Sequence, residues 1–315
     1  MTKKNVPASV KARLLNVSRE TGEDFQQLLT RYAVERLLHR LSVSEHRTGF
    51  VLKGAMLFAL WTGQLHRPTR DLDLLGFGDP EGERLRRIFQ QLCVAQVEDD
   101  GLRFDERSVT VELIREDQEY GGQRVRLVAK LGQARADVQI DVGFGDAITP
   151  PAEEVEFPTL LGMESPRLRA YPKETVVAEK LEALVKLGLA NSRMKDFYDL
   201  LVIARSFPFE GELLRHAVAN TFARRGTELP REAPVGLSET FATDGSKQMQ
   251  WKAFLNRSGV VEAVDLEEVV RRLSAFLLPV LHRAARDESF ASAWKPGAGW
   301  DGITDTSSGT KKGST

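Results

Sequence analysis

Apolar residues recur every three to four positions along much of this chain, as they do on the buried side of an amphipathic helix. The spacing predicts helices over 9–20, 24–42, 56–61, 79–97, 172–188, 193–204, 211–225, 248–256 and 265–286. Pro279 is expected to kink or divide the last of these helices. Strand-like runs cover 109–114, 124–130 and 136–144, with Gly121-Gly122 as the turn of a hairpin between the first two.

The pattern changes after prolines at 150, 151, 158 and 166, beyond which the chain is mostly helical. We therefore expect an N-terminal helical segment (1–47), an α+β core (48–165), a helical C-terminal domain (166–294) and a disordered tail (295–315). The stretch 226–246 should be less ordered than its surroundings. The tail is rich in Gly, Ser and Thr, a composition that buries too little apolar surface to fold.

The most informative stretch covers residues 50–76, FVLKGAMLFALWTGQLHRPTRDLDLLG. Near its end, strand alternation places Asp71 and Asp73 together on one side, with Leu72 between them facing the other way. Two carboxylates side by side repel each other. A divalent cation such as Mg²⁺, which prefers hard oxygen ligands, would neutralise both.

Upstream of this pair, Lys53-Gly54-Ala55 precedes a short apolar helix. A glycine at a strand-to-helix turn lets backbone N–H groups approach a phosphate, aided by the positive end of the helix dipole. A lone D-x-D is most often a solvated surface pair, and a lone K-G is less informative still. Together they predict a phosphate cradle just before a metal-binding carboxylate pair, which is a metal–nucleotide site.

A third acid is expected from the last strand-like run, where Asp137 and Asp141 alternate with apolar residues. Asp141 therefore lies on a polar strand face, as the first two aspartates do. A third carboxylate on a neighbouring strand would suit a two-metal site, in which the ions lie roughly 3.5–4 Å apart. Asp137 or Asp146 could instead be the third acid, and all three could be ordinary polar-face residues.

The helical half contributes two further candidates. Lys180 lies within or beside the apolar stripe of the helix 172–188. A lysine there must reach solvent or find an anion, and the oxygens of a triphosphate are one such anion. Further on, in RMKDFYDLL, Asp196 and Asp199 share one helix face. Acids in a first turn favour the helix dipole, so an ion-paired helix start is the alternative to a functional site.

The balance of basic and acidic residues excludes some classes of function. The chain has 44 basic and 45 acidic residues, so it is not a polycation, and any nucleic-acid contact must come from a local patch. Residues 1–47 carry nine Lys/Arg against five Asp/Glu. The polar face of the helix 24–42 is expected to be solvated, with a patch for an acidic partner as the alternative. It carries Arg31, Glu35, Arg36 and Arg40.

Cys93 is the only cysteine, which excludes an intrachain disulfide or a thiolate cluster and fits a reducing cytoplasm. The first residues have no apolar signal-peptide core. No segment approaches the roughly eighteen uninterrupted apolar residues of a spanning helix. We therefore expect a cytoplasmic protein with no membrane partner.

Four pieces of the chain resemble the AbiEii/AbiGii toxin family, the nucleotidyltransferase-like toxins of bacterial toxin–antitoxin systems, and within it the MenT-type toxins. They are SVKARLLN with DFQQLLTRYAVERLLHRLS, FVLKGAMLF, the R-x-T-x-D-x-D run from Arg67 to Asp73, and the pair AEKLEAL and RMKDFYDL. The resemblance extends over most of residues 9–205, and its first and last pieces are the most specific.

The resemblance implies a polymerase-β-like nucleotidyltransferase core over 48–165, a mixed sheet with flanking helices, followed by a helical C-terminal half. It assigns the metal carboxylates to Asp71 and Asp73, a third strand carboxylate to Asp141, an essential lysine to Lys180 and an essential acid to Asp196. The expected nucleotide-binding residues are Lys53, Gly54, Arg67, Thr69 and Lys180.

The phosphate loop departs from that of related nucleotidyltransferases, which often carry Gly-Ser where this chain has Gly54-Ala55. Backbone N–H groups would have to supply the contact that a serine hydroxyl makes to the triphosphate. Thr69 keeps a hydroxyl two residues before Asp71. We hypothesise that phosphorylation of Thr69 silences the enzyme, because a dianion there would compete with nucleotide and capture metal.

The leading functional hypothesis is Mg²⁺-dependent transfer of nucleotides from a nucleoside triphosphate (NTP) to the 3′ end of tRNA. Such transfer would block aminoacylation and translation, and the tRNA acceptor follows from the resemblance alone. A cognate antitoxin encoded nearby is the expected protein partner. The alternatives are transfer to a small molecule or a protein side chain, since no basic tRNA-binding stripe is evident, and a non-catalytic nucleotide- or RNA-binding module.

Overall fold

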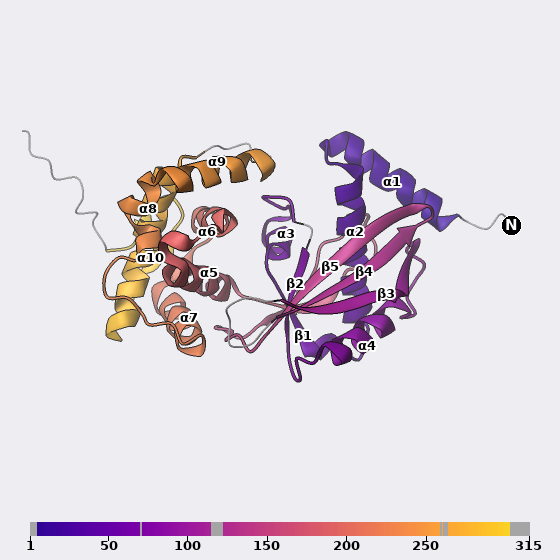
Figure 1. Ribbon diagram of the computed structural model, residues 1–315, viewed down its shortest axis with the longest axis horizontal. Helices are drawn as coiled ribbons and strands as arrows, with labels where there is room; N and C mark the ends of the chain where they lie inside the picture. Colours follow the sequence, from indigo (N-terminus) through magenta and orange to yellow (C-terminus); the bar gives the residue numbers. More distant parts are fainter. Residues whose placement is uncertain (1–4, 70, 115–121, 259, 261–263, 303–315) are drawn as a thin grey trace, which may run out of the picture. The chain divides into compact units, whose positions relative to one another are not determined.

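The computed structural model describes residues 5–69, 71–114, 122–258, 260 and 264–302 and divides the chain into two compact units, Met1–Pro172 and Lys173–Thr315 (Figure 1). The first unit is built on a mixed sheet and the second mainly from helices. This confirms the predicted α+β class with a helical C-terminal half. The predicted boundary, between 165 and 166, precedes the strand Arg167–Ala170, which belongs to the sheet of the first unit.

The sheet of the first unit has seven strands in the order β3-β4-β5-β2-β1-β7-β6. They are β1 (Phe50–Lys53), β2 (Asp71–Gly76), β3 (Leu102–Ile114), β4 (Gly122–Leu131), β5 (Ala134–Phe144), β6 (Glu153–Glu156) and β7 (Arg167–Ala170). The pairs β2–β5 and β1–β7 are parallel and the others antiparallel. β3 and β4 form the predicted hairpin, while Gly121 of its turn lies outside the described residues.

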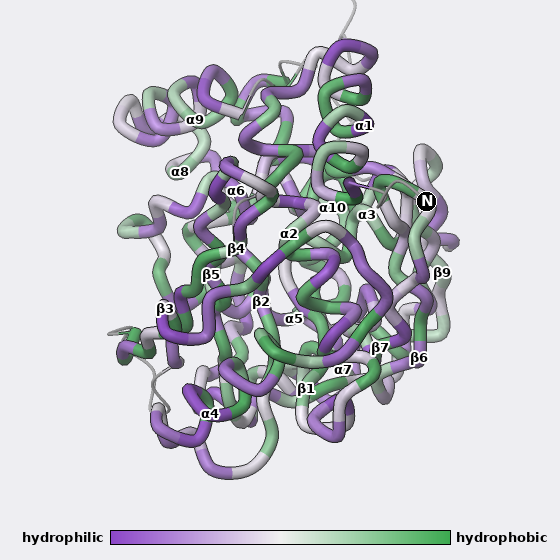
Figure 2. Tube along the Cα trace, turned by 90° about the vertical axis from the view of Figure 1, so that its right-hand side faces the viewer, coloured by the Kyte–Doolittle hydropathy of each residue, from purple (hydrophilic) through white to green (hydrophobic). Residues whose placement is uncertain are grey.

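Helices cover one face of this sheet. They are α1 (Val6–Thr21), α2 (Phe25–Ser42) and α4 (Gly82–Cys93); the short η1 (Arg47–Gly49) and α3 (Met56–Thr62) precede and follow β1 in the chain. α2 packs on β5, α4 packs on β3, and both bury apolar side chains. Along α1, polar and apolar residues alternate (Figure 2), and only Val10 and Leu14 of that helix are buried. The apolar residues of β2, β4 and β5 point toward the helices, so the polar residues share the other face.

The helix predicted over 79–97 is shorter at both ends. Asp79 does not cap it, because its carboxylate accepts a hydrogen bond from the N–H of Glu81 and closes a local turn. The helix then starts at Gly82 and ends at Cys93, where the N–H of Val94 bonds back to Gln91 and tightens the last turn.

The second unit is a helical assembly with a small three-stranded sheet in the order β10-β9-β8. Its elements are α5 (Lys173–Leu187), η2 (Gly188–Ala190), α6 (Met194–Ser206), β8 (Phe209–Glu210), α7 (Gly211–Arg224), η3 (Val235–Leu237), α8 (Glu239–Thr243), α9 (Gly245–Ser258), α10 (Leu266–Arg286), β9 (Ala293–Lys295) and β10 (Gly299–Trp300). The predicted helices of this half are present, with small differences at their ends.

Three features of the second unit differ from the sequence prediction. The stretch 226–246 contains η3 and α8, whose residue Phe241 is fully buried and stacks on Phe197. α10 is not divided at Pro279 but continues as one helix to Arg286, with buried residues such as Leu277 and Val280 on both sides of the proline. Part of the predicted tail forms β9 and β10, because the indole of Trp300 is buried and donates to the Phe276 carbonyl.

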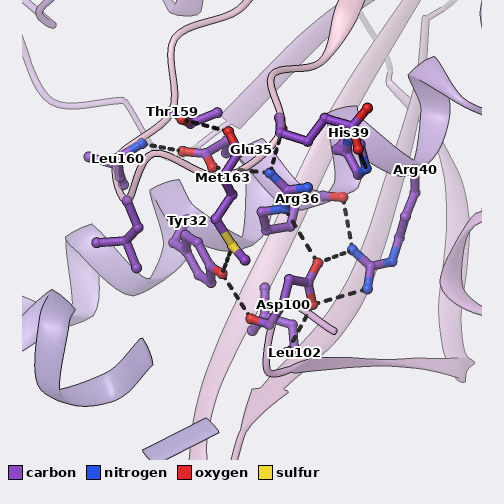
Figure 3. Close-up of polar contacts among 12 residues, drawn as sticks. Tyr32, Glu35, Arg36, His39, Arg40, Asp100, Leu102, Thr159, Leu160 and Met163 are labelled. Atoms are coloured by element: carbon purple, nitrogen blue, oxygen red, sulfur yellow. Dashed lines mark hydrogen bonds and ion pairs between the residues drawn. The ribbon is translucent and has the colours of Figure 1, made fainter. Parts of the chain in front are cut away.

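The charged face of α2 is buried rather than solvated. Glu35, Arg36 and Arg40 are each at most 5% exposed. Figure 3 shows why: both guanidiniums turn toward Asp100, and Arg40 Nη1 lies 2.5 Å from Asp100 Oδ2. Glu35 accepts the N–H of Leu160, while burial raises the pKa of its carboxyl group. Because these partners are distant in sequence, helix periodicity alone predicted that this face of α2 would be exposed to solvent.

No helix in the described ranges combines the length and the apolar character needed to cross a bilayer.

Replacing Asp100 by alanine should destabilise the first unit by about 3–5 kcal/mol, because two buried guanidiniums would lose their carboxylate partner. The measurement is hydrogen exchange of the α2 amides, which reports the free energy of opening. Asp99→Ala is the matched control, since Asp99 only closes a turn through the N–H of Gly101. Equal protection factors in the two variants would contradict a supporting role for the buried cluster.

Candidate active site

Strand β2 carries the two aspartates that the sequence singled out. Leu72 and Leu74 are each 1% exposed, whereas Asp71 and Asp73 are half-buried on the opposite side of the strand. The alternation therefore gives the arrangement that the pattern predicts, two carboxylates on one face. That face is the side of the sheet away from α2 and α4.

The order of the strands brings further charged residues beside this pair. Asp73 is paired in register with Lys53 of β1 on one side and with Asp141 of β5 on the other. Asp141 is in turn paired with Arg124 of β4. Residues paired across neighbouring strands point to the same face. Arg124, Asp141, Asp73 and Lys53 thus form one line across four strands, which we call the charged row.

Cations close both ends of the charged row. Arg124 holds Asp141 with two hydrogen bonds, Nε to Oδ1 at 2.8 Å and Nη2 to Oδ2 at 2.7 Å. Lys53 Nζ lies 2.8 Å from Asp146 Oδ2 and 5.3 Å from the centre of the Tyr171 ring. Arg124 is not among the site residues predicted from the sequence. Strand alternation at 124 and 126 places it on the polar face, but the pairing with Asp141 depends on strand order.

The structure also shows where the two alternatives to Asp141, Asp146 and Asp137, are located. Asp146 follows β5 and forms the ion pair with Lys53. Asp137 lies near the start of β5, its side chain is 75% exposed, and it is bound by Arg135. Of the three acids considered, Asp141 is the one in register with Asp73.

Gly54 brings the backbone against the Asp73 carboxylate. Its φ is +75°, a conformation that L side chains rarely adopt. A Cβ atom at this position would lie 1.9 Å from Asp73 Oδ2 and 2.7 Å from Asp73 Cβ. Any side chain here would displace Asp73, so the glycine is required by this close approach as well as by its own dihedral angle.

The loop between α3 and β2 carries the two other predicted nucleotide-binding residues of this unit. Thr69 is half-buried, and its hydroxyl donates to the Asp71 carbonyl at 3.3 Å. Arg67 is also half-buried and precedes it by two residues. Arg70 of the R-x-T-x-D-x-D run lies outside the described residues.

The donor set fits a hard divalent cation. Asp71 and Asp73 present carboxylate oxygens, the ligands that Mg²⁺ prefers, on one strand face. In the described part of the chain, no three His, Cys, Asp or Glu side chains converge in an arrangement that could hold a metal ion. Both oxygens of Asp141, the third predicted ligand, are engaged by Arg124.

The second unit contains its own group of predicted residues. Lys180 of α5 places Nζ 2.6 Å from Asp196 Oδ1 and 2.9 Å from Asp199 Oδ2, both on α6. All three side chains are at most 15% exposed. Of the two outcomes expected for this lysine, solvent or an anion, the structure shows the second, and the anions are the two acids that share a helix face.

A buried turn positions the start of α6. Asn191 is fully buried, and its side chain accepts the N–H of Arg193. Lys247 of α9 donates to the Asn191 carbonyl at 3.0 Å. These contacts fix the start of α6, whose first turn contains Asp196.

The predicted site residues thus form two groups. Asp71, Asp73, Asp141, Lys53, Gly54, Arg67 and Thr69 belong to the first unit. Lys180 and Asp196 belong to the second. In the second group the lysine and the acid are paired with each other, whereas Lys53 and Asp141 of the first group are paired with Asp146 and Arg124.

A model of the nucleotidyl transferase AbiEii toxin family, type IV toxin–antitoxin system, matches residues 36–272. The match spans most of the chain, including both groups of predicted residues. The chain belongs to the AbiEii nucleotidyltransferase toxin family, as the sequence resemblance implied. Membership of a toxin–antitoxin family implies an antitoxin as partner.

Two solved structures align with most of the chain at low sequence identity. One is a candidate nucleotidyltransferase from H. pylori, with 16% identity, 84% of this chain and 98% of that chain covered, and a TM-score of 0.49. The other is JHP933 from Helicobacter pylori, with 15% identity, coverages of 83% and 94%, and a TM-score of 0.48. Among curated proteins, none matches the sequence.

Gly54→Ala should weaken Mn²⁺ binding at least about tenfold, because the new Cβ would push the Asp73 carboxylate out of place. Gly63→Ala is the matched control: Gly63 has a φ of +77°, and a Cβ added there would meet nothing within 4 Å. Both variants carry the positive-φ cost of about 1–2 kcal/mol. Free Mn²⁺ can be followed by electron paramagnetic resonance, and equal affinities in the two variants would contradict the role given to Gly54.

Proposed function

We propose that the protein transfers nucleotides from an NTP to the 3′ end of tRNA in a Mg²⁺-dependent reaction, as a MenT-type member of its family. The observation that carries the proposal is the pairing of Asp71 and Asp73 on one face of β2, with Asp141 in register on the next strand. Three acids on adjacent strands are costly unless a cation neutralises them, and a triphosphate brings that cation.

Asp71 and Asp73 are the residues that would hold Mg²⁺, with Asp141 as a further ligand. When bound, the metal would stabilise negative charge on the attacking and leaving oxygens. Because Gly54 has no side chain, the backbone of the β1–α3 turn would be able to approach the triphosphate closely. Lys53 and Arg67 supply positive charge on the same unit.

Lys180 and Asp196 are proposed to serve the same reaction. The Lys180 ammonium, now balanced by Asp196 and Asp199, would neutralise phosphate oxygens of the NTP. Asp196 or Asp141 would orient the acceptor hydroxyl and take its proton. The acceptor oxygen forms a bond to the α-phosphorus, the bond between the α-phosphorus and the bridging oxygen breaks, and pyrophosphate leaves.

The biological consequence follows from the acceptor. A tRNA extended at its 3′ end cannot be aminoacylated, so translation would stop. The cognate antitoxin would then be the partner that prevents this outcome.

Asp71→Asn and Asp73→Asn should each lower incorporation of labelled nucleotide into total cellular RNA by about a thousandfold, because amide groups cannot replace the metal-binding carboxylates. Each NTP is supplied in turn with Mg²⁺. Asp137→Asn is the matched control, an exposed acid on the neighbouring strand that should keep full activity. Undiminished labelling by the Asp73→Asn protein would end the assignment.

The salt dependence of acceptor binding distinguishes tRNA from a small-molecule acceptor. Binding of tRNA should weaken steeply as salt rises, because phosphate contacts release counterions. A small hydroxylated substrate should show little salt dependence. Nucleotide binding without any transfer, in wild-type protein, would support the non-catalytic module instead.

Phosphorylation of Thr69 should abolish transfer. The hydroxyl is bonded to the Asp71 carbonyl, so a phosphate there would place two negative charges beside the metal carboxylates. Mass spectrometry of protein co-expressed with its antitoxin is the test, with transfer measured on the modified and unmodified fractions. Full activity of the modified fraction would contradict the silencing role, and so would finding Thr69 unmodified.

A further inference from the structure

A cross-strand ion pair holds Asp141 on the side opposite to Asp73. The guanidinium of Arg124 binds both carboxylate oxygens, at 2.8 and 2.7 Å. Two parallel N–H···O bonds are the geometry in which a planar guanidinium recognises a carboxylate most strongly. The side chains of Arg124 and Asp141 are 29% and 21% exposed, so a ligand from solvent can reach the pair.

Asp141 therefore lies between a cation and another acid. Arg124 of β4 and Asp73 of β2 are its two cross-strand neighbours on the same sheet face. The hydrogen bonds to Asp141, and with them the fields of Asp71 and Glu112, raise the pKa of the Arg124 guanidinium. Arg124 is thus the cation that balances this cluster of acids from the β4 side.

The next arginine of the same strand has a different environment. Arg126 lies two residues along β4 and points to the same face. Its cross-strand neighbour on β5 is the neutral Gln139, and its guanidinium pairs with Glu112 on β3 at 2.5 Å. Arg126 is 47% exposed. It offers the same charge on the same strand without a bond to Asp141.

We propose that Arg124 and a divalent cation compete for the carboxylate of Asp141, so that Arg124 sets how readily the third acid joins the metal site. The inference rests on the proposed function, since it takes Asp71 and Asp73 as the metal-binding acids. The guanidinium fills one acceptor site on each Asp141 oxygen and holds a positive charge beside both, so a cation held by Asp73 gains Asp141 as a ligand more readily when these hydrogen bonds are loosened. Arg124 is a positioning residue in this scheme, because it acts through Asp141.

Whether metal affinity rises or falls when Arg124 is removed shows whether Arg124 competes with the metal or only orients Asp141. If Arg124 only oriented Asp141, its removal would leave metal affinity unchanged or lower it. If Arg124 competes, its removal frees both carboxylate oxygens and metal affinity rises. A partly exposed bidentate pair is worth enough to change the dissociation constant by about three- to tenfold.

The experiment measures Mn²⁺ binding to the full chain by electron paramagnetic resonance. Arg124→Gln should bind Mn²⁺ about three- to tenfold more tightly than wild type, whereas Arg126→Gln should match wild type. Arg124→Lys keeps the charge but loses the two parallel hydrogen bonds to Asp141, so its Mn²⁺ affinity should lie between those of the two glutamine variants. It replaces Arg124→Gln in the experiment if that variant does not fold. Wild-type or weaker binding by a folded Arg124 variant would overturn the inference.

Two further variants tie the effect to its residues. In an Asp141→Asn background, Arg124→Gln should give no additional gain, since the carboxylate being contested is absent; a gain there would overturn the inference. Asp73→Asn should abolish Mn²⁺ binding whether Arg124 is present or not. Binding that survives Asp73→Asn would count against the proposed function itself. Equal dissociation constants for wild type and Arg124→Gln, with Asp73 still required, would remove only the role of Arg124.

Discussion

Repulsion between neighbouring carboxylates is the constraint that organises the first unit. Asp71 and Asp73 share one strand face, and parallel pairing of β2 with β5 adds Asp141 beside them. Such a group is tolerable only with nearby cations, and Lys53 and Arg124 supply them at the ends of the charged row. A sheet face built in this way is suited to recruit further positive charge, which is what a divalent metal ion provides.

The opposite face of the same sheet supplies the rigidity that this arrangement needs. Apolar side chains of β2 and β5 lie under α2 and α4. α2 is in turn held by a buried set of charges around Asp100, so its arginines serve the core rather than a partner surface. Because these contacts fix the strands, the carboxylates cannot move apart to relieve their repulsion.

Local periodicity was sufficient to predict much of this. Strand alternation correctly put Asp71 and Asp73 on one face, and an anionic partner was one of the two outcomes expected for Lys180 in its apolar stripe. Strand order could not be predicted in the same way, because period and propensity say nothing of which strands are neighbours. The Arg124–Asp141 pair and the burial of Arg36 and Arg40 were missed for that reason: their partners are far away in sequence.

The most direct test of a metal–nucleotide site on this sheet face is anomalous diffraction at the manganese edge. Crystals of the full chain would be grown with Mn²⁺ and a non-hydrolysable NTP. The predicted result is a manganese peak bridging Asp71 and Asp73, with the triphosphate against the turn at Gly54. Nucleotide bound elsewhere, with no manganese at the two aspartates, would contradict it.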